Sequence, residues 1–196
     1  MRRVLCIGDS NTYGYDPRSF FGSRYGADVR WTGLLEGRGW TVLNGGENGA
    51  SIPRGRELPA VEALIRRALP LDAVTVMLGS NDLLQGASPE EAGARMEALL
   101  RCIGEKADGA AVLLIAPPPM EPGTWVPNRE LIGRSVRLGA VYRALAEKLG
   151  AAFADAGIWG VALTFDGVHF LPEGHAAFAR GVEDALDKAI KTLRQA

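Results

Sequence analysis

The segment Val4-Leu5-Cys6-Ile7-Gly8-Asp9-Ser10 decides which fold the chain adopts. It starts as an uninterrupted apolar run and becomes polar after Gly8. Short uninterrupted apolar runs are typical of strands that are buried on both faces of a parallel sheet. A serine directly after such a strand lies at the carboxyl end of the sheet, which is where open α/β folds bind their ligands.

The same kind of run recurs along the chain and alternates with segments of helical periodicity. The further predicted strands are Trp40–Leu43, Ala73–Leu78, Ala111–Ala116 and Ala151–Ala154. The predicted helices are Leu58–Leu69, a helix that starts at Ser88-Pro89-Glu90-Glu91, Arg129–Leu149 and Pro172–Leu193. This alternation predicts an α/β fold with three layers, α/β/α, around an open, mainly parallel five-stranded sheet. We expect one domain over residues 1–196, with two long loops, Asn11–Arg30 and Pro117–Asn128.

Two of the predicted helices carry capping residues. Ser88 stands where an N-cap residue accepts a hydrogen bond, and Pro89 and Glu91 follow at the positions expected of a capping box. Gly150 comes directly after Arg129–Leu149 and is typical of a helix C-cap. These residues predict where the two helices begin and end.

Composition excludes several classes of partner. The chain has 196 residues, 47% of them hydrophobic and 23% charged, with a formal net charge of -1. A balanced charge argues against binding to nucleic acid. No apolar stretch approaches the length of about 18 residues that a membrane span needs, so no membrane partner is expected. The apolar run after Met1 is too short for a signal peptide, which favours a cytoplasmic protein.

The two cysteines, Cys6 and Cys102, are too few for a disulfide framework. Cys6 lies in the first predicted strand and Cys102 in a segment with helical periodicity. Both are therefore expected to be buried and reduced.

Residues near the two ends of the chain supply the parts of a serine hydrolase. Ser10 is a candidate nucleophile, and the chain contains only two histidines that could activate it, His169 and His175. Asp166 precedes His169 by three residues, so its carboxylate can reach Nδ1 and leave Nε2 free for the serine. His175 falls in the first turn of the last predicted helix, where a structural role is expected.

Two further segments supply hydrogen-bond donors for an oxyanion. Asn81 follows the third predicted strand and carries a side-chain amide, and Gly49 lies in the glycine-rich turn after the second. A glycine presents an unhindered backbone N–H, and the N–H of Ser10 lies at the end of the first strand. Donors of this kind stabilise the charge that develops on a carbonyl oxygen. All of these groups are predicted to meet at one edge of the sheet.

In this order the motifs resemble the four sequence blocks of the SGNH, or GDSL, hydrolase superfamily. The matching blocks are Gly8-Asp9-Ser10, Asn48-Gly49-Ala50-Ser51, Gly79-Ser80-Asn81-Asp82 and Asp166-Gly167-Val168-His169. The resemblance implies a flavodoxin-like fold. It also implies Ser10 as nucleophile, His169 as base and Asp166 as acid. By the same resemblance, the oxyanion hole consists of the Ser10 and Gly49 N–H groups and the Asn81 side chain.

A narrower resemblance points to the bacterial arylesterase/acyltransferase branch of that superfamily. It rests on Asp28-Val29-Arg30-Trp31-Thr32-Gly33, on Pro117-Pro118-Pro119 and on Phe170 after the histidine. It implies hydrolysis of small esters, with acyl transfer to alcohols as a further reaction. The chain departs from this branch at Tyr13 and Tyr15, where tryptophans are frequent.

Bulky side chains are expected to wall the substrate pocket. The predicted pocket residues are Tyr13, Trp31, Trp125 and Phe170, and Tyr15, Phe20 and Phe21 lie in the same long loop as Tyr13. Such walls favour short acyl groups and aryl esters, so the expected partner is a small-molecule ester.

Other classes of function have less support in the sequence. It contains no H-E-x-x-H motif or cysteine cluster for a metal, and no glycine fingerprint for a nucleotide. We therefore expect no metal and no cofactor. A carbohydrate O-acetylesterase is the main alternative, followed by a thioesterase or lysophospholipase and by a non-catalytic binding module on the same fold. The oligomeric state stays open, a homo-oligomer included.

Overall fold

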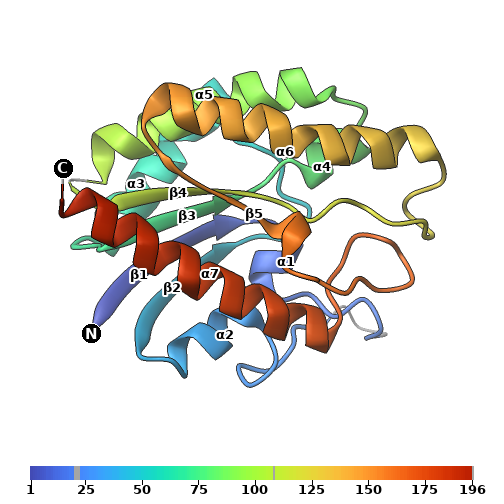
Figure 1. Cartoon of the computed structure of the whole chain (residues 1–196), viewed down its shortest axis with the longest axis horizontal. Coiled ribbons are helices and arrows are strands. Elements are labelled where there is room, and N and C mark those ends of the chain that lie inside the picture. The colour runs from blue at the N-terminus through green and yellow to red at the C-terminus, as the bar shows by residue number, and fades with distance from the viewer. Residues whose placement is uncertain (20–22, 108, 196) are drawn as a thin grey trace.

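The fold is the predicted open sheet of five strands, which are all parallel and lie in the order β2-β1-β3-β4-β5. The computed structural model describes residues 1–19, 23–107 and 109–195 (Figure 1). The strands are Arg2–Gly8 (β1), Trp40–Gly46 (β2), Ala73–Met77 (β3), Ala111–Ala116 (β4) and Ala152–Asp155 (β5). This strand order is the flavodoxin-like one, in which ligands bind beside the carboxyl ends of the central strands.

Helices cover both faces of the sheet. They are Ser10–Tyr13 (α1), Trp31–Glu36 (α2), Leu58–Ala68 (α3), Ser80–Leu84 (α4), Pro89–Lys106 (α5), Arg129–Leu149 (α6) and Pro172–Leu193 (α7), with short 3-10 turns at Gly55–Glu57 (η1) and Ala156–Ile158 (η2). Helices α2 and α7 pack on one face, and α3, α5 and α6 pack on the other (Figure 1). The three predicted layers are thereby confirmed.

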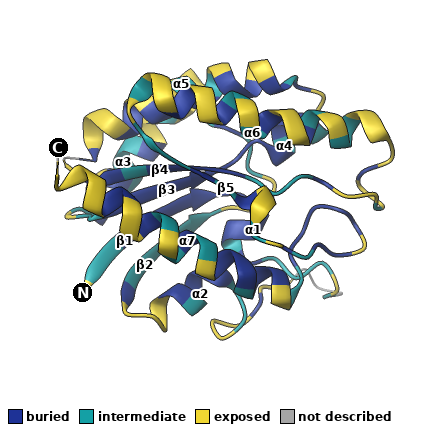
Figure 2. Ribbon diagram, in the orientation of Figure 1, coloured by how far each residue is buried: buried dark blue, intermediate teal, exposed yellow. Residues whose placement is uncertain are grey.

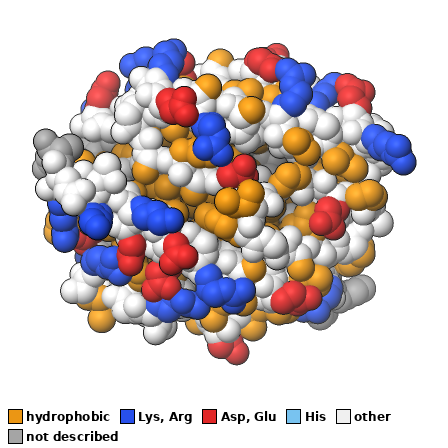
Figure 3. Space-filling view, viewed as in Figure 1, with side chains coloured by type: hydrophobic (Ala, Val, Ile, Leu, Met, Phe, Trp, Pro, Cys, Tyr) orange, Lys and Arg blue, Asp and Glu red, His pale blue; other side chains and the backbone are white. Residues whose placement is uncertain are grey.

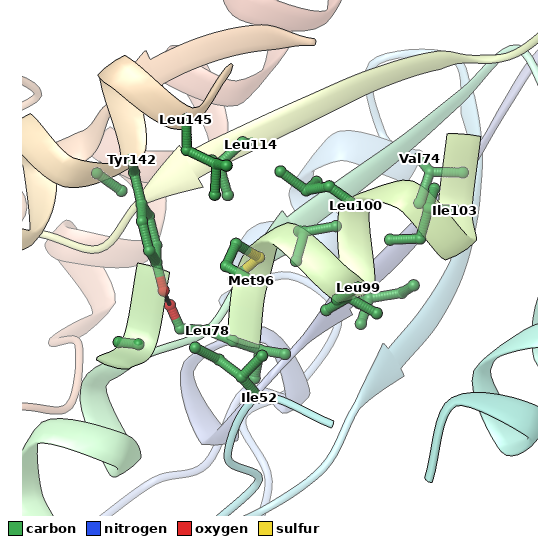
Figure 4. Close-up of a cluster of buried hydrophobic side chains, with 14 of the residues drawn as sticks. Ile52, Val74, Leu78, Met96, Leu99, Leu100, Ile103, Leu114, Tyr142 and Leu145 are labelled. Carbon is green, nitrogen blue, oxygen red and sulfur yellow. Dashed lines mark hydrogen bonds between the residues drawn. The ribbon is translucent and has the colours of Figure 1, made fainter. Parts of the chain in front are cut away.

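The alternation of side chains along β1 explains why both faces need a cover. Val4 and Cys6 point into the core under α2 and α7, whereas Leu5 and Ile7 point into the core under α3, α5 and α6. Burying one such side chain contributes about 1.5–3 kcal/mol. Figure 2 shows the same division in the helices, which are buried toward the sheet and exposed on their outer sides. Figure 4 shows part of the larger core, on the α5 and α6 side.

The predicted helix ends are confirmed. Ser88 Oγ accepts the N–H of Glu91 at 3.1 Å, and Glu91 Oε2 accepts the N–H of Ser88 at 2.7 Å, which completes the capping box of α5. Gly150 ends α6 with a φ of 68°, a left-handed conformation that favours glycine.

Three short helices were not predicted. The loop expected over Asn11–Arg30 begins with α1, α2 follows it directly, and α4 comes immediately after β3. Helices of one or two turns are too short to show a periodicity in the sequence. Phe20 and Phe21, expected near the site, lie outside the described residues.

Both cysteines are buried and free, as predicted. Burial raises the pKa of the Cys6 thiol to about 12, so this thiol is not a nucleophile at neutral pH. Over the described residues, no helix combines the length and the apolarity that crossing a membrane requires.

A groove of about 890 Å³ runs along the free edge of β5, between α6 and α7. Figure 3 shows apolar side chains gathered across this face, with charged groups on either side. The residues that line the groove include none of Ser10, Asp166 and His169. This groove is therefore separate from the predicted chemistry.

Candidate active site

The register of the sheet brings three of the predicted motifs to one place. Gly8, the last residue of β1, pairs with Gly46 of β2 and with Met77 of β3. Because the three strands end at the same level, the residues that follow them are neighbours at the carboxyl edge of the sheet. These residues include Ser10, Gly49 and Asn81.

Ser10, His169 and Asp166 form a continuous chain of hydrogen bonds. Ser10 is the first residue of α1, and its Oγ lies 2.9 Å from Nε2 of His169. On the other side of the imidazole, Nδ1 lies 2.7 Å from Oδ2 of Asp166. All three side chains are buried. The structure thus brings together the serine, the histidine and the carboxylate that the sequence analysis selected.

The carboxylate of Asp166 is held in its ionised form. Burial disfavours its charge, but His169 Nδ1 and the backbone N–H groups of His169 and Val168 bind it and outweigh the burial. Together these contacts lower the pKa of Asp166 well below its usual range. An ionised carboxylate at this position orients the imidazole and stabilises it when it takes up a proton.

Asn11 connects the nucleophile to the histidine loop. Its Nδ2 donates to the carbonyl of Val168 at 3.0 Å, and its Oδ1 accepts the N–H of Phe170 at 3.0 Å. The Asn11 side chain is therefore hydrogen-bonded to the backbone before and after His169. Because Asn11 directly follows Ser10, it links the serine to the histidine loop. The sequence analysis missed this residue, because only its place after Ser10 distinguishes it.

The loop after β4 packs closely on the loop that carries the acid. Glu121 N–H donates to the Gly167 carbonyl at 3.0 Å, and Trp125 N–H donates to the Asp166 carbonyl at 3.1 Å. Two glycines permit this approach: a Cβ on Gly167 would lie 2.1 Å from the Glu121 oxygen, and one on Gly123 would lie 2.2 Å from the Asp166 carbonyl carbon. Gly167 also has a φ of +81°. The sequence analysis did not identify this role for either glycine.

Two of the predicted oxyanion donors, Gly49 and Asn81, lie on segments that contact one another, and the third is the N–H of Ser10 in α1. Asn81 is in α4, and its Nδ2 donates one hydrogen bond to the Ala50 carbonyl at 2.8 Å, which leaves its second N–H. Gly49 is exposed and has a φ of +73°, in the turn that ends at Ala50. Within the described residues, no acceptor takes the backbone N–H of Ser10 or of Gly49. These three donors therefore lie on the segments that follow β1, β2 and β3, at the carboxyl edge of the sheet.

Two aromatic rings flank the imidazole of His169. The ring centroid of Tyr15 lies 4.9 Å from it, and that of Trp125 lies 5.0 Å from it in an edge-on arrangement. Trp125 is 48% exposed, so it forms part of the outer wall of the site. Tyr13 is partly exposed, and the guanidinium of Arg24 lies over its ring at 4.6 Å.

The expectation that Trp31 and Phe170 wall the pocket is corrected. Both rings are fully buried and pack against Phe178 of α7, with centroids 5.0 and 5.2 Å away. Trp31 Nε1 donates to the Asn11 carbonyl at 3.0 Å. The packing of α2 against α7 directs Trp31 into the core beneath the site, and Phe170 enters the same core although it directly follows His169 in sequence.

His175 lies in the same part of the core. It is fully buried, its ring packs against Tyr25 and Phe170, and its Nδ1 accepts the N–H of Trp31 at 3.4 Å. Burial lowers the pKa of His175 to about 4. A neutral, enclosed imidazole of this kind supports the expected structural role.

This burial makes stability depend on pH. In the unfolded chain His175 takes up a proton below its ordinary pKa of 6.5, whereas the folded chain resists protonation down to about 4. The stabilisation present above pH 6.5 is therefore lost as the pH falls toward 4. Relative to His175→Gln, wild type should lose about 2 to 3 kcal/mol of unfolding free energy between pH 7.5 and 4.5. Urea denaturation at both pH values measures this difference, and an unchanged difference would contradict a buried neutral imidazole.

Asp9 is a second buried carboxyl next to the nucleophile. It accepts the N–H of Asn11 at 3.0 Å as the N-cap of α1, and burial raises its pKa to about 6. Its position shows that it anchors the start of α1, and hence Ser10.

Within the described part of the chain, no three His, Cys, Asp or Glu side chains converge to hold a metal ion.

The comparisons with known proteins agree with this geometry. The chain matches the model of the GDSL-like lipase/acylhydrolase family over residues 6–177. The chain belongs to this family. No curated protein sequence matches it significantly.

Solved structures of related esterases superpose on almost the whole chain. A protein of Agrobacterium tumefaciens str. C58, whose assignment as an arylesterase is provisional, has 31% identity and a TM-score of 0.83, over 96% of this chain and 100% of the other. An inhibitor-bound aryl esterase of M. smegmatis has 27% identity and a TM-score of 0.82, over 96% and 100%. Est24, a carbohydrate acetylesterase from Sinorhizobium meliloti, has 27% identity and a TM-score of 0.80, over 96% and 99%. Together with the family match, these neighbours establish that this GDSL-like protein is a carboxylic ester hydrolase.

Proposed function

We propose that the protein is a serine esterase for small carboxylic esters with short acyl or aryl groups. The observation that carries this proposal is the unbroken line of hydrogen bonds from Ser10 Oγ through His169 to Asp166, at the carboxyl edge of the sheet. The esterase neighbours support the reaction class. The substrate is a small-molecule ester, and the mechanism needs no cofactor.

In the first half of the reaction, Ser10 is acylated. Its Oγ attacks the ester carbonyl carbon while Nε2 of His169, 2.9 Å away, takes the hydroxyl proton. The bond between the carbonyl carbon and the alkoxy oxygen then breaks, and His169 gives the proton to the departing alcohol. Asp166 keeps the imidazole in the tautomer that presents an unprotonated Nε2 to the serine.

The carbonyl oxygen becomes negatively charged during this attack. The N–H groups of Ser10 and Gly49 and the second N–H of Asn81 are the donors that would bind it. Removing one donor of this kind from a serine hydrolase typically costs about 10²–10³ in kcat. Because these donors sit on two short helices and a hydrogen-bonded turn, they need little rearrangement when the charge appears.

In the second half, the acyl-enzyme is hydrolysed. His169 Nε2 removes a proton from water, and the oxygen of that water bonds to the acyl carbon. The bond from the acyl carbon to Ser10 Oγ then breaks, His169 returns the proton to Ser10 Oγ, and the carboxylic acid leaves. An alcohol in place of water would give a new ester by the same proton transfers. Trp125 and Tyr15 shield the imidazole from bulk solvent, which supports acyl transfer to alcohols as a side reaction.

The walls of the site favour short acyl chains. Trp125 sits on a loop that is bound to the acid loop by backbone hydrogen bonds, and the 890 Å³ groove lies elsewhere. A long tail gains up to about 0.8 kcal/mol per CH₂ only where apolar surface can bury it. We therefore expect kcat/KM for p-nitrophenyl esters to peak at acetate or butyrate and to fall at least tenfold by octanoate.

Steady-state assays of the ester series measure this, with Ser10→Ala protein as the blank for spontaneous hydrolysis. A kcat/KM that keeps rising through palmitate would instead indicate a lipase or a lysophospholipase. Acetylated xylose and other sugar acetates belong in the same panel, because Est24, at 27% identity, is a carbohydrate acetylesterase. A kcat/KM for a sugar acetate well above that for p-nitrophenyl acetate would favour this second candidate function.

A further inference from the structure

A charged group lies fully buried beside the oxyanion donors. Asp82 follows Asn81 in α4, and its side chain is 0% exposed. Its Oδ2 accepts the N–H of Ile52 at 2.9 Å, and its Oδ1 accepts Nη1 of Arg95 at 2.6 Å. The chemistry proposed above does not use either Asp82 or Arg95.

These contacts hold the loop that carries Gly49. The loop starts where Glu47 N–H donates to the Gly8 carbonyl at 3.1 Å, and it returns to α4 through Ala50 and Ile52. Gly49 itself is exposed, and a Cβ built on it would have no neighbour within 4 Å. Its position therefore depends on the bonds of the residues on either side of it.

Helix α4, to which this loop is hydrogen-bonded, is itself held in the core. Tyr142 is fully buried, and its hydroxyl donates to the Leu78 carbonyl at 3.0 Å. Gly79, the N-cap of α4, has a φ of +118°, and a Cβ there would lie 2.5 Å from that hydroxyl. Figure 4 shows the Tyr142 hydroxyl pointing toward Leu78, with Ile52 on the same side of the core. The loop and α4 are thus fastened to the same packed region.

We propose that Asp82 and Arg95 are positioning residues that set Gly49 relative to Asn81 in the oxyanion hole. Asn81 and Asp82 are adjacent in α4, and each makes one hydrogen bond to the loop. Asn81 donates to the Ala50 carbonyl, and Asp82 accepts the N–H of Ile52. Arg95 of α5, whose side chain is 25% exposed, supplies the charge that a buried carboxylate needs. This inference rests on the proposed esterase function, because it assigns the pair a part in the same reaction.

Loss of the Arg95 charge should change the position of the loop that carries Gly49, and with it the position of an oxyanion donor. A buried carboxylate without its partner carries an uncompensated charge, and the rearrangement that relieves this charge weakens its bond to the Ile52 N–H. A displacement of about 1 Å in a catalytic group can cost about 10²-fold in rate. Because oxyanion donors act mainly on the transition state, the loss should fall on kcat rather than on KM.

The test compares three arginine variants with p-nitrophenyl acetate as substrate. Arg95→Met should lower kcat by about 10- to 100-fold, with KM changed less than threefold. Arg95→Lys should recover part of the loss, because it restores a positive charge near Asp82. Arg101→Met is the matched control on the same helix: Arg101 pairs with Glu97 at the surface at 2.8 Å, and its loss should leave kcat unchanged.

Two readouts separate positioning from stability. Titration with a fluorophosphonate counts the Ser10 hydroxyls that can react, so kcat is expressed per competent site rather than per mole of protein. The pH at half-maximal kcat/KM should stay the same in Arg95→Met, because Ser10, His169 and Asp166 are untouched. If Arg95→Met does not fold, Asp82→Asn provides the same test, because it keeps the shape but loses the charge that binds Arg95.

The outcomes are distinct. A kcat per competent site equal to that of wild type in Arg95→Met, or an equal loss in Arg101→Met, would overturn the positioning role while leaving the esterase proposal intact. A shifted pH profile would overturn it too, because the change would then have reached His169. Wild-type protein that is neither labelled by the fluorophosphonate nor active on any ester would overturn both proposals.

Discussion

Replacing Ser10 by alanine should reduce kcat/KM for p-nitrophenyl acetate by about four to six orders of magnitude. The Oγ of Ser10 is the only part removed, and it is the atom that lies 2.9 Å from the imidazole nitrogen. Without it no acyl-enzyme forms. The oxyanion donors and the binding walls remain, so a small residual rate above the uncatalysed one is expected.

A fluorophosphonate provides the direct measurement. Wild-type protein should gain the mass of one adduct, peptide mapping should place it on Ser10, and the Ser10→Ala variant should gain none. Ser51, in the loop after β2, and Ser80, the first residue of α4, are the internal controls. An adduct on either of them would show that the nucleophile has been assigned to the wrong residue.

Replacing His169 by alanine should have an effect of similar size, whereas replacing His175 should not. His169 alone bridges Ser10 and Asp166, while His175 is enclosed by Tyr25, Phe170 and Trp31. We expect His169→Ala to lower kcat/KM by about four to six orders of magnitude. We expect His175→Gln to change kcat per competent site less than fivefold.

Circular dichroism and thermal unfolding should accompany these assays, because the His175 variant loses packing and a hydrogen bond to Trp31. The two substitutions should therefore have different effects. His169→Ala removes activity with the fold intact, whereas His175→Gln lowers stability while activity per folded molecule remains. The reverse pattern would make His175 the base and would contradict the proposed role of Asp166.

The long elements could be predicted from local pattern alone. An apolar run such as Val4–Ile7 in β1 reports burial on both faces, and the periodicity of Arg129–Leu149 and Pro172–Leu193 matches α6 and α7 from end to end. Capping residues such as Ser88 and Gly150 act within a few positions of themselves. Helices α1, α2 and α4 escaped prediction, because one or two turns contain too few positions to show a period.

The pairing of Asp166 with His169 could also be predicted, because three residues on a turn place the two side chains within reach. The parallel order of strands then implied that Ser10, Gly49 and Asn81 follow neighbouring strand ends. In each case a short-range pattern, combined with a general rule of topology, was sufficient.

By itself, the sequence determined the α/β layers, the long helices and which side chains were candidates for the chemistry, because these depend on periodicity, capping and residue type. Only the tertiary structure decided which side chains support those groups. It placed Trp31 and Phe170 in the core. It also hydrogen-bonded the Asn11 side chain to the backbone before and after His169, and joined Asp82 to Ile52 and Arg95. The physical reason is distance along the chain: Asn11 is 157 and 159 residues from its partners. Contacts of this kind arise only when the packing of complete layers brings remote segments together, and no local pattern encodes them.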